Sequence, residues 1–67
     1  NLMIKSREEL EHTQEQIGRL ERVLAAMKEE ELPEDYRLLS EGYIDQIRRM
    51  RREIDSYLGV MEGEAVA

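Results

Sequence analysis

The chain has 67 residues, a length that allows one domain with a small hydrophobic core. Sixteen acidic and ten basic side chains give a net charge of −6, which disfavours binding to nucleic acid and to anionic membranes. Cysteine is absent, which excludes disulfides, thiolate metal sites and cysteine nucleophiles. No apolar run approaches the roughly 18 residues typical of a membrane span. We therefore expect a soluble, cytoplasmic protein.

The first predicted helix covers residues 6–31. Ser6 and Glu9 have the spacing of a capping box, in which Ser6 accepts from the Glu9 N–H and the Glu9 carboxylate accepts from the Ser6 N–H. From Leu10 onward, apolar residues recur at alternating spacings of three and four, which indicates a helix with one apolar side. Residues 1–5 are predicted to be a lead-in outside this helix.

A corner is predicted at residues 32–34, followed by a second helix over residues 34–59. Pro33 restricts the residue before it to extended backbone, and it suits the first turn of a new helix. Gly59 is predicted to end the second helix, and residues 60–67 are predicted to fray. These elements form one domain, residues 1–67.

The apolar residues of the two predicted helices match in antiparallel order. Counted outward from the corner, Leu20 of the first helix meets Ile47 of the second, and the other pairs follow at the same offset. The sequence therefore predicts an all-α fold, an antiparallel two-helix hairpin with coiled-coil-like packing. The predicted self-association seam consists of the matched residues and two on their flanks: Leu10, Ile17, Leu20, Leu24, Leu39, Tyr43, Ile44, Ile47, Met50, Ile54 and Tyr57.

Each helix has more apolar width than a two-helix seam uses. Val23 and Leu39 lie on one flank of the seam, and Ile44 lies on the other. Two helices alone also bury too little apolar surface to offset the conformational entropy lost on folding. We therefore expect a homodimer in which two hairpins form a four-helix bundle, with the tyrosines in the core and their hydroxyls at its rim.

No arrangement of residues predicts an enzyme. His12 is interpreted as a surface side chain, because its helical neighbours form an ordinary solvated face. A carboxylate metal site in a helical bundle needs acidic side chains that point into the core, whereas the seam is apolar apart from Glu31 near the corner. We predict no catalytic residue, no metal, no cofactor and no small-molecule substrate.

Four arginines concentrate positive charge on the second helix: Arg48, Arg49, Arg51 and Arg52. The first interpretation is structural neutralisation, by glutamates across the hairpin such as Glu21 and by acidic residues four positions away. The predicted pairs at that spacing are Asp45 with Arg49 and Arg51 with Asp55. Two alternatives stay open, namely contact with an acidic protein partner and contact with nucleic-acid phosphates.

Several tracts resemble a helical-hairpin region of bacterial antitoxin-type proteins. They are the capped opening Ile4–Glu8, the tract Arg19–Ala26, the corner that contains proline, and the tracts Asp45–Arg48 and Arg52–Tyr57. In those proteins the hairpin stands just before a helix-turn-helix DNA-binding domain, and no such pattern follows it within these 67 residues. The resemblance implies a dimerisation or partner-docking module of a toxin–antitoxin-like or transcription-regulator system.

We therefore expect a non-enzymatic module for dimerisation and protein interaction, which forms a homodimer and contacts a protein partner. The alternative is a small nucleic-acid-binding regulator that uses the Arg48–Arg52 side of the second helix. The negative net charge argues against this alternative.

Overall fold

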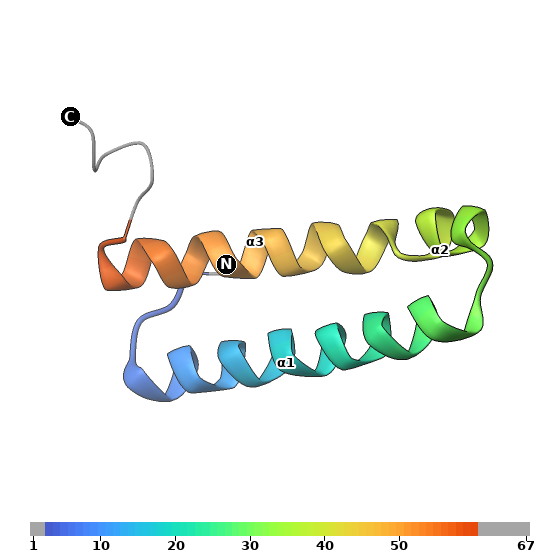
Figure 1. The fold of residues 1–67 in the computed structure, drawn as a ribbon. Coiled ribbons are helices and arrows are strands. Elements are labelled where there is room, and N and C mark those ends of the chain that lie inside the picture. The colour runs from blue at the N-terminus through green and yellow to red at the C-terminus, as the bar shows by residue number, and fades with distance from the viewer. Residues whose placement is uncertain (1–2, 61–67) are drawn as a thin grey trace.

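The computed structural model describes residues 3–60 and contains three helices in that part of the chain (Figure 1). Helix α1 covers Arg7–Glu30, α2 covers Pro33–Leu39 and α3 covers Glu41–Leu58. No strand occurs among the described residues. The predicted all-α class is confirmed, and α1 differs by one residue at each end from the predicted range of 6–31.

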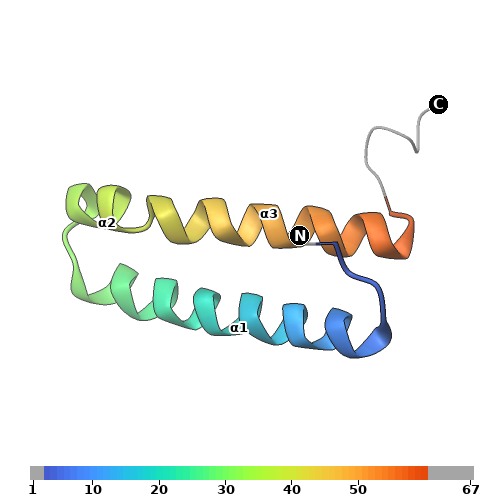
Figure 2. The same ribbon diagram turned by 180° about the vertical axis from the view of Figure 1, so that it is seen from behind.

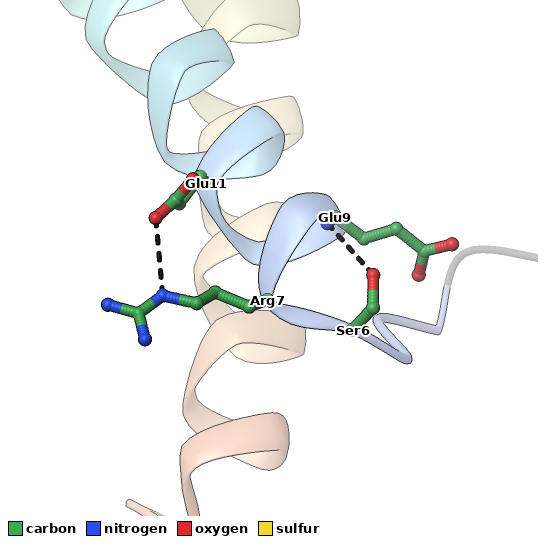
Figure 3. Close-up of polar contacts among 4 residues, drawn as sticks. All are labelled: Ser6, Arg7, Glu9 and Glu11. Carbon is green, nitrogen blue, oxygen red and sulfur yellow. Dashed lines mark hydrogen bonds and ion pairs between the residues drawn. The ribbon is translucent and has the colours of Figure 1, made fainter.

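Ser6 caps the start of α1 as predicted. Its Oγ accepts from the backbone N–H of Glu9 at 3.2 Å (Figure 3). The other half of the predicted capping box is wrong, because Glu9 Oε1 accepts from the backbone N–H of Lys5 at 2.7 Å. Figure 3 also shows Arg7 Nε donating to Glu11 Oε2 at 3.4 Å on the next turn. The cap therefore fixes the direction in which the preceding chain enters the helix.

The chain reverses direction between α1 and α2. The backbone N–H of Glu31 donates to the Met27 carbonyl at 2.9 Å and closes the last turn of α1. Leu32 is extended, as a residue before proline must be, and Pro33 is the first residue of α2. As a result, α1 and α3 lie side by side and run in opposite directions (Figure 1 and Figure 2).

The second predicted helix, residues 34–59, is divided in two at Ser40. This residue has ψ of −12°, whereas an α-helical residue has a ψ of about −42°. Ser40 is only 2% exposed, and its Oγ donates to the Arg37 carbonyl at 3.4 Å. A serine hydroxyl bonded to a carbonyl one turn earlier bends a helix. Helix α2 is accordingly displaced from the axis of α3 (Figure 1).

Helix α3 ends at Leu58, and the predicted stop residue Gly59 adopts a left-handed φ of +82°. The Gly59 N–H donates to the Ser56 carbonyl at 3.3 Å, and the Val60 N–H donates to the Asp55 carbonyl at 2.8 Å. These two bonds form a Schellman motif, which satisfies the last carbonyls of the helix. Of the predicted frayed tail, residues 61–67 lie outside the described part of the chain.

The hydrophobic core lies between α1, α3 and the segment before α1. Its buried residues are Ile4, Ile17 and Ile54, and the half-buried Leu10, Ile47 and Met50 pack against them. Residues 3–5, here called the N-terminal arm, lead from the start of α1 across to α3 (Figure 1 and Figure 2). Residues 3–5 lie outside α1, as predicted for the lead-in, and the burial of Ile4 adds a contribution to the core that the prediction did not include.

Candidate self-association surface

A single copy buries only part of the predicted self-association seam. Ile17 and Ile54 are buried, whereas Leu39, Tyr43 and Tyr57 are exposed. The other seam residues are half-buried: Leu10, Leu20, Leu24, Ile44, Ile47 and Met50. Most of the seam is therefore in partial contact with water.

Large side chains with apolar bodies remain accessible within this seam and on its flank. The exposed fraction is 37% for Tyr43, 42% for Tyr57, 42% for Val23 and 52% for Leu39. The prediction placed the tyrosines in a core, with only their hydroxyls at the rim. In one copy, Tyr43 and Tyr57 are instead more than a third exposed, which leaves surface for another molecule to cover.

An open depression of about 630 Å³ lies between α1 and α3 beside the N-terminal arm. Its lining mixes apolar and polar side chains and includes Ile4, His12, Gln16, Arg49, Met50 and Glu53. Within this lining, His12 Nε2 forms a hydrogen bond with Gln16 Nε2 at 3.1 Å. A side-chain amide neither accepts nor donates the proton that acid–base catalysis must move, so this contact makes no catalytic pair. The depression offers a contact surface.

Glu9 and His12 have the Glu-x-x-His spacing that carboxylate metal sites in helical bundles use. In the structure these two exposed side chains have different partners. The Glu9 carboxylate accepts from the Lys5 N–H at 2.7 Å, and His12 bonds to Gln16. Across residues 3–60, no three His, Asp or Glu side chains gather where they could hold a metal ion.

Only one of the four clustered arginines forms an ion pair with another described residue. Arg51 Nη2 lies 3.1 Å from Glu21 Oε2, so α3 is joined to α1 across the helix pair. The neutralisation predicted from acidic residues four positions away on the same helix is wrong for Arg51, and Arg49 has no ion pair within the described chain. Arg48 and Arg52 also have no ion pair within the described chain, and both are exposed, as Arg49 is. Three guanidinium groups are thus open to an outside partner.

Ile4 is the core residue that the sequence reasoning missed. It lies two residues before the cap residue Ser6, and Leu10 lies four residues after that cap. Apolar residues on either side of a helix cap pack together in a hydrophobic staple, and Ile4 and Leu10 flank this cap in a similar way, with Leu10 packed against the cluster that contains Ile4. A search for apolar residues around the cap, rather than for helical periodicity, would have indicated this contact.

A second contact outside the prediction lies near the corner. Lys28 Nζ of α1 is 5.0 Å from the centroid of the Tyr36 ring of α2, within the range of a cation–π interaction. Tyr36 is half-buried, unlike the two tyrosines of α3. This contact links α1 to α2 on the far side of the turn.

Among residues 3–60, no helix combines the length and the apolar character that crossing a membrane requires. The features that remain for function are the accessible seam, the depression beside the arm and the three open arginines. Comparison of the chain with known protein families, with curated proteins and with solved structures found no match.

Proposed function

We propose that this chain is a non-enzymatic self-association module, a helical hairpin whose second copy completes a four-helix bundle. The observation that carries this proposal is the small size of the core. Within the described residues, the buried apolar side chains are Ile4, Ile17 and Ile54, whereas Tyr43 and Tyr57 remain exposed. A second copy packed on the seam would bury the surface that one copy leaves open.

The usual means of stabilising so short a chain point the same way. Domains below roughly 70–80 residues commonly depend on disulfides, a structural metal or oligomerisation. This chain has no cysteine, and its described part contains no group of side chains that could hold a metal. Association of copies is the means that its exposed apolar side chains support.

The resemblance to the antitoxin-type hairpin supports a setting for this module. We propose that it holds two copies of a bacterial regulator, or a regulator and its protein partner, together. In that setting the two-fold symmetry of a homodimer matches the commonest arrangement of soluble oligomers.

Sedimentation equilibrium tests the proposed self-association directly. Protein concentration is varied from below micromolar to several hundred micromolar, and helical circular dichroism is followed over the same range. We expect a dimer whose helicity falls as it dissociates, because the isolated copy loses the burial that holds its helices. A fully helical monomer at every concentration would contradict the proposal.

A second candidate function is contact with an anionic partner through α3. It is favoured by the exposure of Arg48, Arg49 and Arg52, none of which has an ion pair within the described chain. Guanidinium groups bind carboxylates and phosphates through two parallel hydrogen bonds, so both acidic peptides and nucleic acids have matching chemistry.

Titration at two salt concentrations tests this second candidate, with an acidic peptide and a DNA oligonucleotide as probes. We expect binding that weakens steeply with salt and is lost when Arg48, Arg49 and Arg52 are all replaced by Gln. The control carries Arg7→Gln, Arg19→Gln and Arg22→Gln on α1, which removes three positive charges elsewhere. Equal loss in both variants would show that net charge, rather than this group of arginines, decides binding.

A further inference from the structure

We infer that the second copy packs on the face of the helix pair that carries the N-terminal arm, here called the arm face. The opposite face, which carries the ion pair between Glu21 and Arg51, stays in water. This inference rests on the proposed self-association and adds to it the surface that performs it. The evidence for the arm face is the difference between the side chains that each helix presents on its two sides.

On α1, the arm face is a stripe of four residues, Gln16, Leu20, Val23 and Met27. Their spacings of four, three and four place them above one another on one side of the helix. Gln16 lines the depression beside the arm, which shows to which face the stripe belongs. Beyond Gln16 the stripe is apolar, and Val23 is 42% exposed.

On α3, residues at spacings of three and four continue the same face: Tyr43, Gln46, Met50, Glu53 and Tyr57. The middle three line the depression beside the arm, and Tyr57 lines a neighbouring one that the arm also borders. The two tyrosines at the ends of the stripe are 37% and 42% exposed. Tyrosine is enriched at protein interfaces because a large apolar ring carries a hydroxyl that can still bond to water.

On α1, the opposite face offers charged and small side chains in place of apolar surface, whereas on α3 it includes Ile44 and Leu58 as well as Arg51. Its stripe on α1 contains no large apolar side chain and consists of Gln14, Gly18, Glu21, Ala25 and Lys28. Arg51 of α3 donates to Glu21 at 3.1 Å, and both side chains are a little over half exposed. A second copy on this face would remove that pair from water, with a desolvation cost that the Coulomb attraction does not reliably offset.

An interface of typical area must include the N-terminal arm. Stable interfaces bury about 800 Å² on each partner, which is about one seventh of the 5675 Å² accessible surface of this chain. The exposed apolar side chains near the corner do not cover such an area alone, although there are five of them: Val23, Leu32, Leu38, Leu39 and Tyr43. The contact therefore extends along the face to the arm, where Met3 is 65% exposed.

Two matched charge insertions test the inference in the intact chain. Val23→Glu adds a carboxylate on the arm face, and Leu58→Glu adds one on the opposite face, seven residues after Arg51. Both positions are exposed apolar residues, 42% and 53% respectively, so neither substitution replaces a side chain of the core. In sedimentation equilibrium we expect Val23→Glu to weaken dimerisation by at least about tenfold and Leu58→Glu by less than about threefold.

If either variant loses helicity, a second measurement tests which face the dimer buries. Because the chain has no cysteine, Val23→Cys and Leu58→Cys each introduce a single thiol. We expect the rate of thiol labelling at position 23 to fall as protein concentration rises through the dimerisation range, and the rate at position 58 to stay constant. The reverse pattern, or a larger effect of Leu58→Glu, overturns the face assignment and leaves the dimer intact. A wild-type chain that never dimerises overturns the proposed function itself.

Discussion

At Gly59 the backbone enters the left-handed region, the only positive φ among residues 3–60. A residue with a Cβ loses about 1–2 kcal/mol in that conformation, because the Cβ approaches the following carbonyl. Glycine has no such atom, so the two Schellman hydrogen bonds form without strain. The residue that ends α3 is therefore set by backbone geometry rather than by packing.

Replacing this glycine tests that account. We expect Gly59→Ala to lower the free energy of unfolding by about 1 kcal/mol. The control is Gly18→Ala in the interior of α1, where an added Cβ would lie 3.5 Å from Arg22 Nη1, an ordinary contact. Gly18→Ala should raise the free energy of unfolding by about 0.5–1 kcal/mol, because alanine favours the helix. Urea unfolding at one fixed protein concentration measures both, and effects of the same sign would contradict the account.

Single residues were the most predictable level of this molecule. Ser6, Pro33 and Gly59 each act through bonds to neighbouring residues in the chain, so a short stretch of sequence contains the information. Ile4 was missed because its partners lie on two helices, and one apolar residue before a cap has no periodicity of its own. The prediction succeeded where the interaction is local and failed where an isolated side chain meets distant elements.

At the scale of elements, the ion pair between Glu21 and Arg51 joins α1 to α3. Both side chains are a little over half exposed, so solvent screens the attraction. We expect a double-mutant cycle with Glu21→Gln and Arg51→Gln to give a coupling energy of about 0.2–1 kcal/mol that falls at high salt. The matched cycle pairs Glu21→Gln with Arg48→Gln, where the structure has no ion pair, and should give a coupling near zero.

The division of the second helix at Ser40 could not have been read from the sequence. Apolar residues recur at spacings of three and four on both sides of this position, and this spacing indicates one helix: Tyr36, Leu39, Tyr43 and Ile47. The cause is the tertiary burial of Ser40, whose hydroxyl bonds to the Arg37 carbonyl instead of to water. Periodicity shows which side of a helix is apolar, but it does not show which carbonyl a buried hydroxyl will find.

At the scale of the whole molecule, stability depends on a few central side chains. Ile47 packs against the core, so a charge at that position would lose its water without gaining a partner. We expect Ile47→Asp to abolish helical circular dichroism at micromolar concentration. Ala26→Asp, which puts the same charge at an exposed position of α1, should keep most of it. Wild-type helicity in Ile47→Asp would show that the core lies elsewhere.

The helical class and the two long apolar stripes followed from the sequence, because their periodicity extends over many residues. The exposure of the individual seam residues did not follow from the sequence. Leu10 and Tyr57 look equivalent in the apolar pattern, yet the first is half-buried and the second is exposed. Leu10 packs against the core cluster to which Ile4 of the arm belongs, and no single stretch of the apolar pattern specifies this contribution from outside the helices.

The three buried isoleucines lie in the arm, in α1 and in α3, whereas α2 contains no buried residue. Such a segment opens to solvent at a lower free energy than the rest of the chain. In native-state hydrogen exchange, the amide protons of α2 should therefore exchange through local opening, well before those around Ile17 and Ile54. The corner then behaves as a small cooperative unit of its own, which can unfold and refold while the opposite end of the helix pair stays closed.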